Sequence, residues 1–317
     1  MCWKSPKTLF LFFLILYSFP MMADGDLKTR FSKNVDPESV IPEYPRPLLA
    51  RKRWINLNGL WDYSILPADS SYKNLPDGQI LVPFPIESQL SGVKKKVGHE
   101  NRLWYSRYFS MPEDYTGERI ILNFGAVDWH ARIWINDRYI GEHKGGYDPF
   151  SFDITDALTW SGKEKIVISV WDPTNKKAIP SGKQVINPGG IWYTSVTGIW
   201  QTVWLEPVPQ SHIASIKITP DVDKGTITVT THIEKGSPSQ NLRITAFDGD
   251  IPVAEKVFST DGEAKLSIPS PRLWSPGSPF IYNLAVALEN GEMTIDRIES
   301  YFAMRKIEIA KDKSGLN

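Results

Sequence analysis

The stretch RIILNFGAVDWHARIWINDRYIGEH, residues 119–143, predicts that this protein is built from β-strands. Apolar and polar residues alternate in RIILNF and again in ARIWIN, which is the pattern of strands with one buried face. Asp137 and Arg138 separate the second run from YIGEH, so we expect a hairpin there. KIVISVW (165–171) and IWQTVWLEP (199–207) are two further predicted strands, and no long stretch has the apolar period of a helix.

The composition agrees with an all-β fold and excludes one class of partner. The chain of 317 residues contains 24 Pro, 22 Gly and 12 Trp, a mixture that suits many short strands joined by tight turns. This length is too great for one ordinary core, so we expect two domains. Because 36 Lys and Arg balance 36 Asp and Glu, we expect no nucleic-acid partner.

Residues 1–23 are predicted to be a secretory signal peptide. Lys4 and Lys7 precede the apolar run at 9–19, and Ala23 lies where a peptidase could cut. The run is too short for a stable membrane anchor, so we expect no membrane association after cleavage. The remaining chain has no cysteine and no Asn-x-Ser/Thr glycosylation site, which favours a secreted or periplasmic bacterial protein.

A proline-rich joint, PVPQSHIAS at 207–215, predicts the boundary between two domains. We place the first domain at 24–208, including a polar strap at 24–50 that is expected to lie over it. The second domain is placed at 209–305. Its alternating runs indicate about seven short strands, which favours an immunoglobulin-like sandwich.

Four stretches, taken in order, carry a resemblance to a known family. LNGLWDYS, VPFPIESQLSG, the segment from LWYSRYFS to FSFDIT, and GIWQTVWLEP are similar to the amino-terminal sugar-binding domain of family-two glycoside hydrolases, the β-galactosidases, β-glucuronidases and β-mannosidases. The resemblance is dense over 50–208 and weaker through 303. It implies a jelly-roll (galactose-binding-like) sandwich followed by an immunoglobulin-like sandwich, and it also implies that the full-length enzyme can form homo-oligomers.

The resemblance also implies where the chemistry of such an enzyme lies. In that family a third domain, a (β/α)₈ barrel, carries two catalytic glutamates that act as acid/base and nucleophile of a retaining hydrolysis, about 5 Å apart. No residue of this chain matches either glutamate motif, and residues 306–317 fall where the connection to the barrel begins. We therefore expect no catalytic residue and no activity of this chain alone. A gene fragment, a truncated reading frame and a stand-alone domain remain alternatives.

The long loop within VWDPTNKKAIPSGKQVINPGGIWY, residues 170–193, is the candidate binding site. Loops of this length in compact domains are usually functional or disordered, and the resemblance implies that this one leans towards the sugar pocket. Aromatic rings pack on the apolar faces of pyranoses. The polar candidates are Asp172, Lys183 and Gln184, and the stacking candidates are Trp192 and Tyr193. In the alternative, Lys183 is simply solvated and Asp172 caps a turn.

The tryptophans of GGIWYTSVTGIWQTVWLEP, residues 189–207, have two possible roles: they are buried in the core or they bind sugar rings. A strand alternates its side chains between two faces, so Trp200, Thr202 and Trp204 are expected to share one face and to be buried in the sandwich. A platform for sugar rings is the alternative. Trp192 lies outside the alternating run beside glycines, and we expect it at the surface.

The remaining residue types indicate no other chemistry. The five histidines have neither cysteine partners nor a His-x-x-x-His spacing, so we expect no metal site and no cofactor. The preferred interpretation is the non-catalytic amino-terminal portion of a secreted β-glycosidase, most similar to β-galactosidases, that binds carbohydrate. The alternatives are a stand-alone, lectin-like carbohydrate-binding module and a purely structural sandwich protein.

Overall fold

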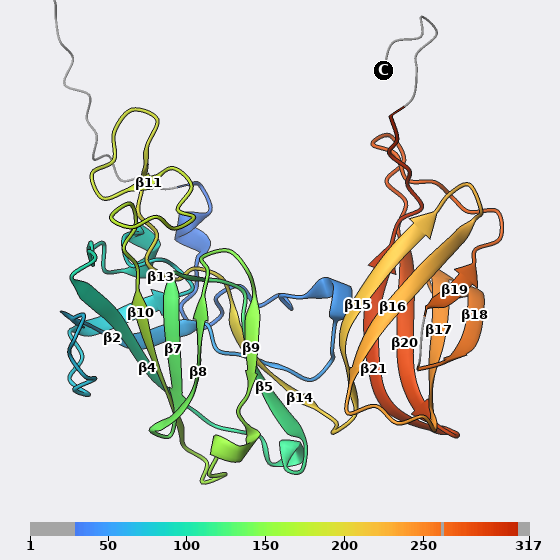
Figure 1. The fold of residues 1–317 in the computed structure, drawn as a ribbon, viewed down its shortest axis with the longest axis horizontal. Coiled ribbons are helices and arrows are strands. Elements are labelled where there is room, and N and C mark those ends of the chain that lie inside the picture. Colours follow the sequence, from blue (N-terminus) through green and yellow to red (C-terminus); the bar gives the residue numbers. More distant parts are fainter. Residues whose placement is uncertain (1–28, 261–262, 310–317) are drawn as a thin grey trace, which may run out of the picture.

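The protein consists of two β-sandwiches that lie side by side (Figure 1). The computed structural model describes residues 29–260 and 263–309. The predicted signal peptide therefore lies outside the described residues, as does most of the predicted connection at 306–317. The described helices are short 3₁₀ turns: η1 (Ser32–Asn34), η2 (Pro47–Leu49), η3 (Gln89–Ser91), η4 (Glu113–Tyr115) and η5 (Thr155–Ala157). Within these residues, no helix has the length and hydrophobicity needed to span a bilayer.

The first sandwich is formed by a four-stranded and a six-stranded sheet. The strand orders are β1-β14-β5-β9 and β3-β2-β4-β10-β7-β8, and two short pairs, β6–β13 and β11–β12, complete it. The strands are β1 (Ile55–Asn56), β2 (Gly59–Pro67), β3 (Gly78–Val82), β4 (Asn101–Phe109), β5 (Arg119–Phe124), β6 (Val127–Asp128), β7 (His130–Ile135), β8 (Arg138–Lys144), β9 (Phe150–Asp153), β10 (Glu164–Trp171), β11 (Gln184–Val185), β12 (Tyr193–Thr194), β13 (Gly198–Ile199) and β14 (Val203–Val208).

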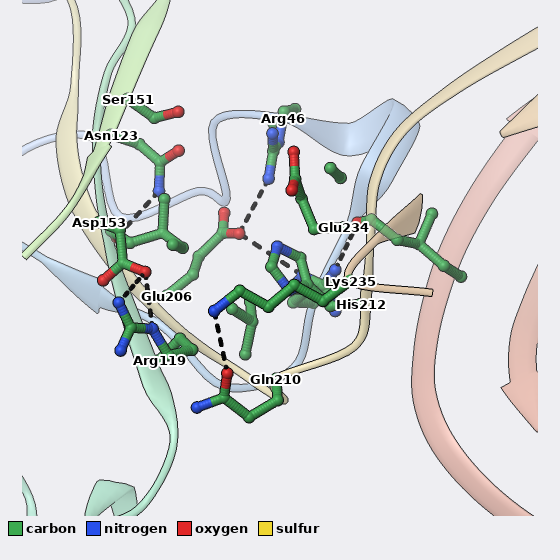
Figure 2. Close-up of a pocket in the computed structure, with 15 residues that line it drawn as sticks. Arg46, Arg119, Asn123, Ser151, Asp153, Glu206, Gln210, His212, Glu234 and Lys235 are labelled. Atoms are coloured by element: carbon green, nitrogen blue, oxygen red, sulfur yellow. Dashed lines mark hydrogen bonds and ion pairs between the residues drawn. The ribbon is translucent and has the colours of Figure 1, made fainter. Parts of the chain in front are cut away.

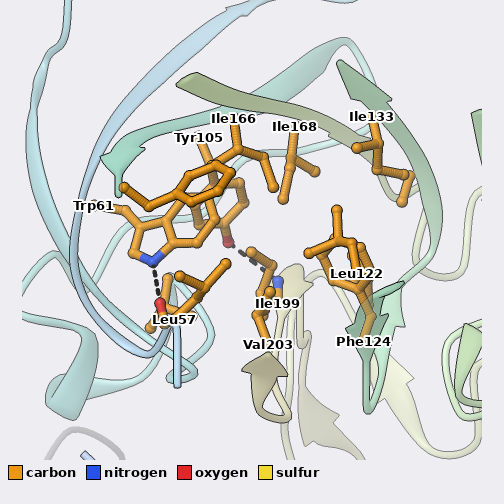
Figure 3. Close-up of a cluster of buried hydrophobic side chains, with 14 of the residues drawn as sticks. Leu57, Trp61, Tyr105, Leu122, Phe124, Ile133, Ile166, Ile168, Ile199 and Val203 are labelled. Carbon is orange, nitrogen blue, oxygen red and sulfur yellow. Dashed lines mark hydrogen bonds between the residues drawn. The ribbon is translucent and has the colours of Figure 1, made fainter. Parts of the chain in front are cut away.

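The core of this sandwich is filled by alternate residues of both sheets. Figure 3 shows Trp61 and Tyr105 entering the core from the six-stranded sheet, and Val203 and Phe124 entering it from the other sheet. All four side chains are buried. The period-two pattern of the sequence therefore corresponds to a real inner face, and the predicted jelly-roll sandwich is confirmed.

The predicted hairpin at IWINDRYIGEH is present. β7 pairs with β8, and Ile135 faces Arg138 across a two-residue connection. Asn136 and Asp137 have positive φ angles of 48° and 63°. This is the backbone of the tight turn whose twist matches that of the flanking strands.

The expectation for Trp200 and Trp204 is only partly correct. The run 199–207 is not one strand: β13 pairs with β6, β14 pairs with β5, and the chain steps between them at 200–202. Trp200 is therefore outside a strand and only partly buried. Trp204 is buried, 3% exposed, but Val203 and Leu205 are the residues of β14 that enter the core. Trp204 lies on the opposite face of β14, where its indole Nε1 donates to Glu206 at 2.5 Å.

The second sandwich contains a three-stranded sheet, β15-β16-β19, and a four-stranded sheet, β18-β17-β20-β21. Its buried cluster includes Ile227, Leu242, Val286 and Phe302. The immunoglobulin-like prediction is thereby confirmed. The strands are β15 (His212–Asp221), β16 (Thr226–Glu234), β17 (Gln240–Asp248), β18 (Ile251–Ser259), β19 (Ala264–Ser267), β20 (Tyr282–Asn290) and β21 (Met293–Phe302).

The amino-terminal strap contacts both sandwiches, not only the first. On the first, the carbonyl of Val40 accepts from the Asn58 amide at 3.1 Å. On the second, Ala50 forms an isolated bridge with Glu299 of β21. The buried Arg51 guanidinium forms an ion pair with buried Asp296. Figure 1 shows the strap, in blue, crossing from one sandwich to the other.

Candidate functional site

The loop between β10 and β13, residues 172–197, stands at one end of the first sandwich (Figure 1). Its two ends are joined by buried polar contacts. The Thr197 hydroxyl donates to Asp172 Oδ2 at 3.0 Å, and the backbone N–H and the hydroxyl of Thr174 donate to the two Asp172 oxygens at 2.6 and 2.9 Å. Since Asp172 is only 3% exposed, its carboxylate holds the base of the loop.

The loop folds back on itself through a short parallel pairing. Gln184 of β11 faces Tyr193 of β12, and the Tyr193 N–H donates to the Lys183 carbonyl at 2.9 Å. The Lys183 ammonium lies 5.8 Å from the centre of the Tyr193 ring. These contacts bring together four of the five candidates, which come from two segments eight to ten positions apart in sequence: Lys183, Gln184, Trp192 and Tyr193.

A tight turn presents the two aromatic candidates to the surface. The Trp192 N–H donates to the Gly189 carbonyl at 3.1 Å. Gly190, between them, has a φ of +59°, a conformation that a residue with a Cβ rarely adopts. Trp192 is 49% exposed and Tyr193 is 64% exposed. The expected surface position of Trp192 is therefore observed.

A hollow of about 490 Å³ lies inside the loop. Its volume is in the range of small-molecule sites. Trp192 lies on one side of it, Gln184 contributes a polar group, and Asn175, Lys176 and Asn187 line the remainder. The hollow therefore combines one large ring with several hydrogen-bonding groups.

Two carboxyl groups that the sequence did not single out lie under the loop. Asp128 Oδ2 accepts from the Gln184 amide at 3.2 Å, and Gln184 Oε1 accepts from the Val196 N–H at 2.7 Å. Glu87 accepts from the Thr197 N–H at 2.9 Å and from the Ser195 hydroxyl at 3.2 Å. The amide of Gln184 is thus held at both of its ends.

The electrostatics of these carboxyl groups are unusual. Burial, followed by the negative charge of Asp172, raises the pKa of Asp128 to about 7. Burial also raises the pKa of Glu87 to about 7, although hydrogen bonds from Thr197 and Ser195 oppose the shift. The pKa of Asp172 is raised for the same first reason. Near neutral pH, Asp128 and Glu87 are therefore each partly protonated and able to donate as well as accept a hydrogen bond.

One signal in the sequence could have located Glu87 and Asp128. Each lies beside a turn within a stretch that resembles the family, VPFPIESQLSG and GAVDWH. Neither spacing nor periodicity links them to Asp172, because the three residues come from separate segments of the chain that only the folded structure brings together. Among residues 29–260 and 263–309, no group of three or more His, Cys, Asp or Glu side chains is arranged to hold a metal ion.

A second cavity, of about 260 Å³, lies between the two sandwiches. Figure 2 shows Arg46 pointing at Glu206 and Arg119 pointing at Asp153 on its wall. The Tyr44 hydroxyl also donates to Glu206, at 2.6 Å. Because these charges are engaged with one another, the cavity is best explained as part of the junction between the sandwiches.

Comparison with known families agrees with the fold and with the quoted motifs. The model described as "Glycosyl hydrolases family 2, sugar binding domain" matches residues 79–209. The model described as "Glycosyl hydrolases family 2" matches residues 211–305. The chain belongs to glycosyl hydrolase family 2. The resemblance inferred from the sequence is thereby confirmed.

The alignments with individual relatives cover only part of the length of each relative. A β-galactosidase of Thermoanaerobacter pseudethanolicus is 27% identical over 221 residues, covering 66% of this chain and 29% of that protein. A β-glucuronidase of Streptococcus agalactiae is 24% identical over 285 residues, covering 86% of this chain and 47% of that protein. The chain thus spans less than half the length of these relatives.

A solved structure supports the same arrangement of the two sandwiches. The β-glucuronidase from Ruminococcus gnavus in complex with N1-substituted uronic isofagomine has a TM-score of 0.69. The alignment covers 85% of this chain and 49% of that one, with 19% sequence identity. At this identity the comparison shows a shared fold.

Proposed function

We propose that this chain is the non-catalytic, carbohydrate-facing portion of a secreted retaining β-glycosidase. The observation that supports this most directly is the loop at 172–197, where exposed Trp192 lines a hollow and exposed Tyr193 follows it in sequence, inside a family-two sugar-binding domain. The relatives include a β-galactosidase and a β-glucuronidase, so a β-linked glycoside is the proposed partner.

In this proposal the loop residues have two different roles. Trp192 and Tyr193 contact the sugar, because the apolar faces of a pyranose pack on aromatic rings. The Lys183 ammonium and the Gln184 amide N–H that does not bind Asp128 donate hydrogen bonds to hydroxyl or carboxylate oxygens of the sugar. Asp172 positions the loop without touching the sugar, since its oxygens already accept from Thr174 and Thr197.

The hydrolytic chemistry is assigned to a barrel domain of the whole enzyme. Retaining hydrolysis needs a pair of carboxyl groups about 5 Å apart, one of them accessible as nucleophile. The carboxyl groups of Asp128 and Asp172 are buried. These two groups and that of Glu87 accept hydrogen bonds from the loop. They are therefore proposed to support the loop and not to cleave a glycosidic bond.

The test is to measure turnover and binding with the same preparation. Residues 24–317 should fold and should not hydrolyse nitrophenyl β-galactoside or β-glucuronide. Titration calorimetry with galactose and glucuronic acid should show weak binding that Trp192→Ala removes. Activity that remains with the protein through stringent purification would refute the non-catalytic role.

A stand-alone carbohydrate-binding module is the second candidate function. The hollow and its one aromatic ring, Trp192, are formed within this chain, which is what a lectin-like protein would need. Sequencing the DNA downstream of the codon for Asn317 separates the two. An in-frame barrel favours the glycosidase, and an unrelated gene favours the module.

Export is also proposed, on the charged start and apolar run of residues 1–23. Intact-mass analysis of secreted material should give a chain that begins near Asp24. Retention of residues 1–23 in the mature protein would contradict it.

A further inference from the structure

Another hollow, of about 620 Å³, lies on the outer face of the six-stranded sheet, apart from the loop hollow and from the cavity between the sandwiches. It arises from the alternation of β4, β7 and β10. Leu103, Ile133 and Ile168 point into the core, so their neighbours along each strand point outward. On this outer face Ser169 lies opposite both Trp104 and Arg132. A small side chain between two large ones leaves the depression.

Aromatic rings form a continuous row along this hollow. Trp104 lies between Tyr72 and Trp134, with ring centres 5.5 and 5.6 Å away and interplanar angles of 31° and 30°. Tyr139 continues the row 5.6 Å beyond Trp134. Tyr139 is 50% exposed, and Tyr72 and Trp134 are partly exposed. Rings in such a row present their edges and outer faces to a ligand.

One buried polar group in the row has no partner. Trp104 is 6% exposed, and its indole Nε1 has no hydrogen-bond partner among the described residues. A buried donor left without a partner costs about 1–3 kcal/mol. Because Trp104 lines the hollow, we expect a ligand or a water bound there to accept the hydrogen bond of the indole N–H.

Two guanidinium groups lie on the floor beside the rings. Arg102 donates through Nε to the Ala68 carbonyl at 3.1 Å and through Nη1 to the Ser169 hydroxyl at 3.4 Å. Arg132 uses Nε to reach Glu142 at 3.1 Å. Burial first, and then the charge of Arg132, lowers the pKa of Arg102, while the charge of Glu142, the ion-pair partner of Arg132, opposes this shift. The acidic residues of the hollow, Asp69 and Asp137, are exposed on its rim.

We propose that this hollow is a second carbohydrate-binding site, which takes an acidic oligosaccharide. Its sugar rings lie along Trp134 and Tyr72, and its carboxylate or sulfate group pairs with Arg102 and Arg132. Planar guanidinium groups match such oxyanions with two parallel hydrogen bonds. An anion there also adds a second counter-charge, beside Glu142, which already pairs with Arg132. The hollow shares no lining residue with the hollow of the 172–197 loop.

The proposal is tested by titration calorimetry with three oligosaccharide series of equal length. Mannuronate oligomers carry only carboxylates, carrageenan oligomers carry only sulfates, and cello-oligomers are neutral. We expect at least one acidic series to bind about tenfold more tightly than the neutral one, and we expect the binding to weaken with salt. Whichever acidic series binds identifies the oxyanion.

Variants then locate the binding. Arg132→Gln and Trp134→Ala should each weaken acidic binding about tenfold or more, because a charge-assisted contact or a stacked ring is lost. Lys217→Gln removes an exposed charge on β15 and should change nothing, which controls for net charge. Trp192→Ala should also leave this binding intact, so failure of the loop site and failure of this site can be told apart.

Four results would overturn the proposal. The first is that no series binds, and the second is that neutral and acidic series bind equally. The third is that Arg132→Gln, shown to be folded by near-ultraviolet circular dichroism, binds as the parent does. A dimer in sedimentation equilibrium that Trp134→Ala dissociates would instead assign this face to a second copy of the chain.

Discussion

The hydroxyl of Thr197 donates to the carboxylate of Asp172 across a loop of 24 intervening residues, and both side chains are buried. This contact closes the 172–197 loop at its base. Gly198 follows directly and has a φ of +97°; a Cβ there would lie 2.0 Å from the Tyr105 hydroxyl oxygen. That hydroxyl instead accepts from the Ile199 N–H at 3.2 Å. The loop is therefore anchored to the core of the sandwich at the point where it ends.

Thr197→Val should loosen the loop without unfolding the sandwich. It removes one hydrogen bond to a carboxylate, so we expect a loss of about 1–2 kcal/mol in the free energy of unfolding. Hydrogen exchange and limited proteolysis should both become faster within 172–197. The exposed Thr194→Val variant is the matched control. Unchanged protection in Thr197→Val would mean that the Asp172 contact does not close the loop.

Trp192→Ala and Trp204→Ala should have opposite effects. Trp192 is exposed, so its truncation should lower affinity for the sugar and change stability by less than about 1 kcal/mol. Trp204 is buried and donates to Glu206, so its truncation should cost about 3–5 kcal/mol. Galactose titration and denaturant melts measure the two effects. A large loss of stability in Trp192→Ala, with a loss of sugar affinity in Trp204→Ala, would contradict both assignments.

Asp128→Asn should change how stability depends on pH. The folded pKa of Asp128, about 7, lies above its unfolded value near 4, so the folded state binds more protons between these values. Stability contributed by this group is therefore lost as pH rises from about 4 to about 7. The variant should be more stable than the parent at pH 8, on the order of 2 kcal/mol, and equal to it near pH 4.

Denaturant melts across this pH range are the measurement for Asp128→Asn. Asp250→Asn, which removes a carboxylate from an exposed site, should leave the pH profile parallel to that of the parent. Parallel profiles for Asp128→Asn as well would contradict a raised pKa at Asp128.

Arg51→Met should weaken the junction of the two sandwiches. It leaves Asp296 buried without its ion-pair partner, and breaking such a pair costs about 3–5 kcal/mol. Because Arg51 joins the strap to the second sandwich, we expect calorimetry to resolve two transitions in place of one. Arg53→Met breaks exposed ion pairs with Asp114 and Glu118 and should cost less than about 1 kcal/mol. Equal losses in the two variants would exclude a role for the buried pair.

Local patterns in the sequence were sufficient for the strands and for the family. The hairpin of β7 and β8 follows from alternation on both sides of the turn expected at Asp137 and Arg138, which only needs residues close in sequence. The structure places the turn one residue earlier, at Asn136 and Asp137. The surface position of Trp192 likewise follows from its glycine-flanked turn. The four family stretches located the sugar-binding domain, because motifs within a domain persist in order along the chain.

Alternation by itself does not say what covers each face of a strand. It placed Trp204 opposite Val203 on β14, but the sheet as a whole decides that Val203 enters the core and that Trp204 is buried on the other face, where it binds the same Glu206 as Tyr44 and Arg46 of the strap. The break at 200–202 also depends on pairing with β5 and β6. Both features are set by contacts between residues far apart in sequence.

The sequence alone determined the all-β architecture, the β7–β8 hairpin and the membership of the family, since these depend on period-two patterns and ordered motifs. Only the tertiary structure decided that Glu87 and Asp128 support a loop anchored at Asp172, and that Arg102 and Arg132 lie on one face of a sheet beside Trp104. The physical reason is the same in each case. Desolvation and like-charge repulsion act through space, so the strand pairings that bring distant residues together decide which side chains share one environment.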